Sequence, residues 1–217
     1  MLGSLVIVEQ AKDLDEDNVI AQVRDADVVI TNWATRRIPD ALVADPGKLK
    51  YVLNIGGTCK AAVPLGLIQA GIPVTNWGDT PAFSVAEGAM SLLLAVLKDL
   101  RIRAEALVEG KGGGLKKQGV VSGTLRGLRV GLYGCGVIGR QFVRMMEPFE
   151  PELLVFDPYA KELPEACRRV ESLDVLCEES EALVIWAGLS DETSGSLTAA
   201  HLAKLPDHGI VINTARG

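Results

Sequence analysis

The chain has 217 residues, of which 48% are apolar and 23% are charged, a composition typical of a globular α/β protein with a buried core. Its net charge of −6 argues against a surface for nucleic acid or for an anionic membrane, so we expect neither as a partner. The most apolar stretch, residues 89–97, is too short to cross a bilayer, and we find no signal-peptide pattern at the start.

Short apolar runs alternate with helical patterns along the whole chain. The runs are rich in Val, Ile and Leu and seldom alternate with polar residues, as in strands buried on both faces of a parallel sheet. The predicted strands are residues 5–8, 28–31, 51–55, 74–75, 129–133, 153–156, 183–187 and 210–213. The predicted helices are residues 17–24, 39–44, 65–70, 84–109, 137–148, 174–179 and 199–204. This alternation predicts an α/β fold built from βαβ units.

The longest predicted helix, residues 84–109, ends at a glycine-rich segment, residues 110–114, which we expect to form a loop or a flexible arm. Ser84 and Glu87 have the spacing of a capping box at its start, and its apolar positions share one face. The helix either joins two domains and contributes to a subunit contact or is a long surface helix, and the sequence leaves both alternatives open.

Residues 134–139, Gly-Cys-Gly-Val-Ile-Gly, follow a predicted strand and open a predicted helix. In this spacing Gly134 permits a tight turn, Gly136 lets a pyrophosphate approach the backbone, and Gly139 lets the helix pack closely on the strand. Asp157 ends the next strand, where its carboxylate would accept hydrogen bonds from ribose hydroxyls and repel a 2′-phosphate. The pattern predicts a dinucleotide site that favours NAD over NADP, and the alternative is an ordinary glycine turn.

The cysteines of the chain lie far apart in the sequence. None has the spacing of metal ligands, which predicts reduced thiols in a cytoplasmic protein and no metal site. The cysteines are Cys59, Cys135, Cys167 and Cys177.

The chain resembles the D-isomer-specific 2-hydroxyacid dehydrogenases, the family that includes D-3-phosphoglycerate dehydrogenase. Besides the glycine loop, the segments that carry the resemblance are residues 71–76, 84–87, 125–132, 156–158, 189–193 and 211–217. The resemblance implies two Rossmann-like parallel-sheet domains, both incomplete here: a flavodoxin-like substrate domain over residues 1–98 and an NAD-binding domain over residues 99–217. It also implies NAD-dependent interconversion of a small D-2-hydroxy acid and its 2-oxo acid, in a homodimer.

The resemblance assigns roles to individual residues. Arg216 matches the arginine that binds the substrate carboxylate and polarises the carbonyl, a task suited to a planar fork of charged donors. The turn whose backbone N–H groups hold the substrate carboxylate is formed by Ile55, Gly56, Gly57 and Thr58. The cofactor contacts implied beyond the three loop glycines and Asp157 are Val137, Ile138, Thr193, Thr214, Ala215 and Arg216.

The sequence departs from the family pattern around the expected substrate. Gly57 to Lys60 replaces the usual Gly-Val-Gly-x-Asp, Asn32 stands where an arginine is common, and residues 186–188 replace His-x-Pro. These departures leave the identity of the acid open. Trp33 and Lys60 either reshape the acid pocket or lie at the surface.

In the family the catalytic glutamate and histidine lie beyond the segment that ends here at Gly217, and the opening strand and helix also have no counterpart. We therefore expect a chain truncated at both ends. His201 and His208 are expected to be surface residues. A non-catalytic NAD-sensing protein and an inactive fragment remain as alternatives to the dehydrogenase.

Overall fold

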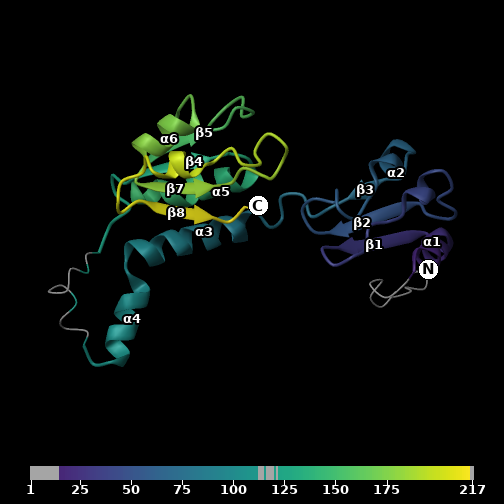
Figure 1. Cartoon of the computed structure of the whole chain (residues 1–217), viewed down its shortest axis with the longest axis horizontal. Helices are drawn as coiled ribbons and strands as arrows, with labels where there is room; N and C mark the ends of the chain where they lie inside the picture. The colour runs from purple at the N-terminus through teal and green to yellow at the C-terminus, as the bar shows by residue number, and fades with distance from the viewer. Residues whose placement is uncertain (1–14, 112–114, 116–119, 121, 216–217) are drawn as a thin grey trace. The chain divides into compact units, whose positions relative to one another are not determined.

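The computed structural model describes residues 15–111, 115, 120 and 122–215 (Figure 1). The chain divides into two compact units, Met1–Thr80 and Pro81–Gly217, each with its own hydrophobic core. The predicted strand over residues 5–8 lies outside the described residues.

The first unit contains a parallel sheet in the order β1-β2-β3. Leu42, Val52 and Leu67 are fully buried in its core. Its elements are α1 (Glu16–Asp25), β1 (Val28–Asn32), the 3-10 helix η1 (Asp40–Val43), β2 (Tyr51–Ile55), α2 (Leu65–Gln69) and β3 (Val74–Thr75). These elements agree with the predicted ones to within a residue or two at each end.

The second unit contains a parallel sheet whose described strands follow the order β6-β5-β4-β7-β8. The strands are β4 (Arg129–Tyr133), β5 (Glu152–Phe156), β6 (Cys167–Arg169), β7 (Ala182–Ile185) and β8 (Ile210–Asn213). The chain runs outward from β4 in one direction and then returns to β7 on its other side, which is the strand order of a Rossmann sheet. The predicted α/β class with parallel sheets is confirmed.

Helices cover both faces of this sheet. The helical elements are α3 (Ala82–Leu97), α4 (Leu100–Val108), α5 (Val137–Met146), the 3-10 helix η3 (Glu147–Phe149), α6 (Leu173–Glu179) and α7 (Ala199–Leu202). Leu153 and Val155 of β5 pack in one core cluster with α3 and α5, whereas Leu154 between them packs in another with α6. This alternation explains why the strands read as unbroken apolar runs: both of their faces are buried.

The prediction of one helix over residues 84–109 is wrong. Asp99 has a left-handed backbone with φ of 49°, which ends α3 and separates it from α4. Figure 1 shows α4 turning away from α3 at this point. The capping box is also absent, because α3 begins at Ala82 and Ser84 therefore lies inside its first turn.

Two further differences concern the limits of elements and units. Strand β6 was not predicted, because Cys-Arg-Arg at a sheet edge carries no apolar pattern. Helix α3 packs on the sheet of the second unit, so the compact units divide after Thr80, whereas the sequence grouped this helix with the substrate domain. The functional assignment of residues 1–98 and 99–217 to two domains stays a prediction.

Candidate functional site

Four loops leave the carboxyl edge of the parallel sheet in the second unit. They comprise residues 134–136 after β4, 157–160 after β5, 186–193 after β7, and 214–215 after β8. Open parallel sheets bind ligands at this edge, next to the point where the strand order reverses. In this sheet that point lies between β4 and β7, so the glycine loop leaves the sheet beside it.

The loop glycines differ in their surroundings. Gly134 has φ of 92°, and a Cβ there would lie 3.0 Å from the Ala187 nitrogen. A Cβ on Gly139 would lie 3.1 Å from the Gly134 oxygen, so this glycine allows α5 to pack closely on the loop. A Cβ on Gly136 would meet no heavy atom within 4 Å. The tight turn, the open approach and the close packing that the spacing predicts are therefore all present.

Helix α5 begins directly after this loop. Gly136 is its N-cap residue, and no side chain of the described residues caps the helix there. Val137 is exposed at the first helical position, whereas Ile138 packs against the core. The first-turn N–H groups thus point out of the sheet edge with a partial positive charge.

The carboxylate of Asp157 joins the glycine loop to the loop after β5. Its Oδ2 accepts a hydrogen bond from the Cys135 nitrogen at 2.7 Å. Its Oδ1 accepts hydrogen bonds from the nitrogens of Tyr159 and Ala160, at 2.9 and 3.0 Å. The acid therefore stands beside the glycine loop; its Oδ1 already accepts two hydrogen bonds, whereas Oδ2 accepts one and keeps a lone pair for a further donor.

Two contacts that sequence reasoning missed hold the loop after β5. Arg169 donates from Nη1 to the main-chain oxygen of Asp157 at 2.8 Å and from Nη2 to the main-chain oxygen of Ala160 at 2.6 Å. The Tyr159 hydroxyl donates to Glu192 Oε2 at 3.3 Å, and the Glu192 carboxylate raises the pKa of Tyr159. The paired residues are 9 to 33 positions apart in the sequence, so no local sequence pattern predicts these contacts.

The loop after β7 is fixed by its own hydroxyl groups and by an indole. Thr193 Oγ1 accepts from the Ser190 nitrogen at 2.7 Å and donates to the Gly188 oxygen at 2.6 Å. The Trp186 ring lies 5.5 Å from the Phe142 ring of α5, measured between centroids. Thr193 therefore shapes its loop, and its hydroxyl has little capacity left for a ligand.

The expected residues after β8 are only partly within the described chain. The Ala215 nitrogen donates to Asn213 Oδ1 at 3.0 Å. Thr214 Oγ1 and Trp186 Nε1 are buried and have no hydrogen-bond partner in the described part of the protein. Arg216, the candidate catalytic residue, lies outside the described residues.

We next consider the cysteine and histidine side chains near the sheet as possible nucleophiles or metal ligands. Burial raises the pKa of the Cys135 thiol, and burial raises the pKa of Cys167 to about 12, so both stay protonated at neutral pH. His201 caps α7 by accepting from the Thr198 nitrogen at 3.0 Å, and it is half-buried, contrary to the surface position predicted for it. Within the described residues no His, Cys, Asp and Glu group is suited to a metal ion.

The predicted substrate turn lies at the carboxyl edge of the sheet in the first unit. Asn76 Nδ2 donates to the Gly57 oxygen, and the Trp77 nitrogen donates to the Gly56 oxygen at 3.1 Å. The Asn54 side chain reaches the Thr58 oxygen at 3.4 Å. The structure thus brings Ile55, Gly56, Gly57 and Thr58 together in one turn, in a different unit from the glycine loop.

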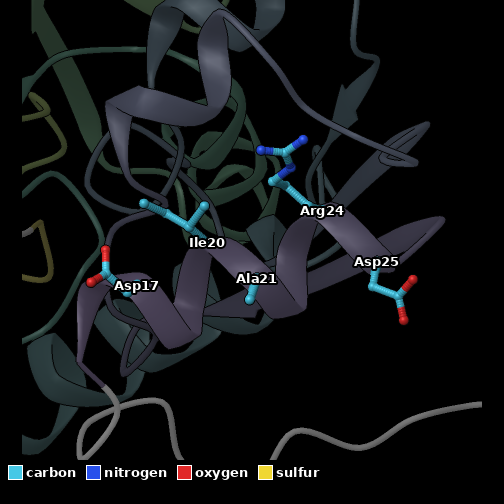
Figure 2. Close-up of a pocket in the computed structure, with 5 residues that line it drawn as sticks. All are labelled: Asp17, Ile20, Ala21, Arg24 and Asp25. Atoms are coloured by element: carbon cyan, nitrogen blue, oxygen red, sulfur yellow. The ribbon is translucent and has the colours of Figure 1, made fainter.

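A surface hollow lies beside α1 in the first unit (Figure 2). It is lined by Asp17, Ile20, Ala21, Arg24 and Asp25. Arg24 is paired with Asp45 at 2.5 Å, and α1 ends just before the amino end of β1. The hollow therefore lies near the amino end of β1, whereas parallel sheets bind ligands at the carboxyl ends of their strands. We assign no function to it.

The comparisons with known proteins agree with this geometry. Residues 90–217, more than half of the chain, match the family profile of the D-isomer specific 2-hydroxyacid dehydrogenase, NAD binding domain. D-3-phosphoglycerate dehydrogenase of Methanocaldococcus jannaschii is 27% identical over 97% of this chain and 40% of its own length. Hydroxypyruvate reductase of Thermotoga maritima is 30% identical over 95% of this chain and 66% of its own length.

A solved structure extends the likeness to the fold. The apo form of D-mandelate dehydrogenase from Rhodotorula graminis superimposes with a TM-score of 0.80, covering 95% of this chain and 66% of that one, at 19% sequence identity. The chain thus spans between 40% and 66% of the lengths of these three proteins.

Among its described residues, no helix has both the length and the apolar character needed to cross a membrane.

Proposed function

The chain belongs to the D-isomer specific 2-hydroxyacid dehydrogenase family, and on that premise we propose that it takes part in NAD-dependent interconversion of a D-2-hydroxy acid and its 2-oxo acid. The family expected from the motifs is confirmed. The observation that carries the proposal is the pairing of an open glycine loop with the Asp157 carboxylate at the switch point of a Rossmann sheet.

The loops at this edge fit the cofactor. Gly136 leaves space for a pyrophosphate, and the first-turn N–H groups of α5 favour its charge. The remaining lone pair of Asp157 Oδ2 suits a ribose hydroxyl, and the charge of the carboxylate disfavours the 2′-phosphate of NADP. The buried, unpartnered Thr214 Oγ1 suits a polar group of the nicotinamide half. When bound, the nicotinamide supplies or accepts the hydride.

The substrate acid is assigned to two other segments. The Gly56 and Gly57 oxygens accept from Trp77 and Asn76, which holds the turn in place. The Gly56 nitrogen donates to the Asn54 oxygen at 2.9 Å, so the N–H groups assigned to the carboxylate are those of Gly57 and Thr58. Arg216, by its resemblance to the family arginine, binds that carboxylate and polarises the carbonyl. The substrate is therefore a small 2-oxo or 2-hydroxy acid.

The proposal also includes the oligomeric state of the protein and its location in the cell. The protein is a homodimer whose contact includes six exposed apolar side chains from the later part of α3 and from α4: Leu92, Val96, Leu100, Ile102, Leu107 and Val108. Its location is cytoplasmic, a proposal that the four free cysteines support. Light scattering of wild type and of Val96→Asp tests the dimer, because a buried charge would dissociate it.

The experiment that tests the function combines NADH binding with turnover. NADH absorbance is followed with a panel of 2-oxo acids, and NADH binding is measured separately by titration calorimetry. We expect the complete protein to turn over at least one acid and Arg216→Ala to lower its kcat/KM by about a thousandfold. Arg216→Lys is the matched control that keeps the charge without the planar fork. Binding of NADH without turnover of any acid would instead favour a nucleotide sensor.

A further inference from the structure

Two tryptophans meet at the carboxyl edge of the sheet in the first unit. Trp33 directly follows β1 and Trp77 follows β3. Their rings form an edge-to-face pair with centroids 5.1 Å apart and planes at 85°. The pair is nevertheless open to solvent, since Trp33 is 60% exposed and Trp77 37% exposed. Exposed indoles packed together form an apolar surface at an edge where parallel sheets bind ligands.

The pair is attached to the turn that we assign to the substrate carboxylate. A Cβ on Gly56 would lie 3.2 Å from Trp33 Nε1, so the indole packs directly on the glycine. The backbone nitrogen of Trp77 donates to the Gly56 oxygen at 3.1 Å. An acid whose carboxylate is held by this turn would therefore have its side chain within reach of both rings.

We propose that Trp33 and Trp77 recognise the side chain of the substrate and select 2-oxo acids with an aromatic or large apolar substituent. The inference rests on the proposed function. A flat apolar group would bury indole surface and add ring–ring contacts, whereas a methyl group would cover little of it.

The neighbouring cations do not favour a phosphorylated acid. Arg37 pairs with Asp40 at 3.2 Å and also donates to the Lys60 oxygen at 3.2 Å. The backbone nitrogen of Lys60 donates to Thr58 Oγ1 at 3.4 Å, and its exposed side chain would bind a phosphate as a solvated point charge. The indoles therefore offer the larger contact surface beside the turn.

The test compares three probes with the same carboxylate and carbonyl: phenylpyruvate, pyruvate and phosphohydroxypyruvate. Steady-state kcat/KM with NADH is measured for each. Binding is followed independently by the indole N–H signals in heteronuclear NMR spectra of the NADH-bound chain, assigned with Trp33→Phe and Trp77→Phe. We expect phenylpyruvate to exceed pyruvate in kcat/KM by at least about tenfold and to shift both indole signals.

Variants separate recognition from folding. Trp33→Ala and Trp77→Ala should each reduce the ratio of kcat/KM for phenylpyruvate to kcat/KM for pyruvate by about tenfold. The phenylalanine variants should retain most of the preference because they keep a ring. Val28→Ala is the matched control, since Val28 is 52% exposed at the opposite end of β1. It should leave the preference unchanged.

The outcomes distinguish this inference from the function on which it rests. Turnover of pyruvate or phosphohydroxypyruvate at least equal to that of phenylpyruvate, with unmoved indole signals, would overturn the inference and leave the proposed function standing. The same holds if the alanine variants keep the full preference. If no 2-oxo acid is bound or reduced while NADH still binds, the proposed function and the inference both fail.

Discussion

The glycine loop of the second unit and the glycine turn of the first unit occupy equivalent places but are built differently. Each follows a central parallel strand and faces the carboxyl edge of its sheet. The loop at residues 134–139 is shaped by its own backbone: a left-handed Gly134, an open Gly136 and a buried Gly139. The turn at residues 55–58 is instead held by side chains, those of Asn54 in β2 and of Asn76 directly after β3.

This difference explains why the first site can be recognised from a sequence motif and the second cannot. A site formed by local backbone geometry needs glycine at fixed spacing, so the requirement is visible as a motif. A site formed by side chains from three strand ends needs only that the partners meet in space. Asn76, whose side chain holds the Gly57 oxygen, is nineteen positions away, and the segment 71–76 that it ends does not reveal this contact.

The largest expected effect is the loss of stability when Gly134 of the glycine loop is replaced by alanine. Gly134→Ala places a Cβ 3.0 Å from the Ala187 nitrogen at a φ of 92°, which alanine rarely adopts. We expect the free energy of unfolding of the second unit to fall by about 3 kcal/mol. Thermal unfolding followed by circular dichroism measures this loss.

Gly136→Ala is the control, because its Cβ meets no atom within 4 Å. It should leave the stability of the unit nearly unchanged and weaken NADH binding instead. If the two alanine variants unfold at the same temperature, the distinction between a strained glycine and an open one is wrong.

The second prediction concerns the carboxylate that joins the glycine loop to the loop after β5. In Asp157→Asn only one oxygen remains to accept the bonds from Cys135, Tyr159 and Ala160, and the negative charge is lost. NADH should bind about tenfold more weakly, a loss of about 1.4 kcal/mol, and the preference over NADPH should shrink. Titration calorimetry with both nucleotides measures the two effects. An unchanged ratio of affinities would remove Asp157 from nucleotide selection.

A smaller effect is expected where the first unit holds its turn by side chains. Thr31 Oγ1 donates to Asn54 Oδ1 at 2.8 Å, and both residues are buried. Thr31→Val keeps the shape but leaves that amide oxygen without its donor, which should cost about 1 kcal/mol of stability in the first unit. Thr31→Ser, which retains the hydroxyl, should cost less. Equal losses in the two variants would assign the effect to packing rather than to the hydrogen bond.

The same contrast between local and long-range contacts explains which features of the fold could be predicted from the sequence. The parallel strands and the glycine loop were predictable because apolar runs and glycine spacing are local signals. Strand β6 was not, since Cys-Arg-Arg pairs only at the sheet edge, and neither was the break at Asp99, because its left-handed backbone leaves the helical apolar spacing uninterrupted. The Trp33–Trp77 pair was equally hidden, because the two rings are brought together by strands far apart in the chain.

The smallest expected effect is the loss of stability when a lysine is removed from a surface ion pair, compared between the two units. In the second unit Lys204 lies 2.8 Å from Asp174 and 2.5 Å from Glu178, with its side chain 33% exposed. In the first unit Lys50 lies 2.6 Å from Asp27 alone and is 75% exposed. The hydrogen bond from each lysine lowers the pKa of its aspartate below the ordinary value of 3.8. The better-covered, doubly paired lysine should contribute more to stability.

The pH dependence follows from the direction of these pKa shifts. A carboxyl whose pKa is lower in the folded state adds stability above its unfolded pKa, and this stability is lost as the pH falls through the folded pKa. Lys204→Ala should therefore lower the Tm at neutral pH, and the difference from wild type should vanish as the pH falls through the folded pKa of Asp174, which lies below the ordinary 3.8. Lys50→Ala should show the same trend with a smaller amplitude. Melting curves of both variants from neutral to acid pH measure it. An equal or larger effect of Lys50→Ala would mean that pairing with a second carboxylate and partial burial add nothing at Lys204.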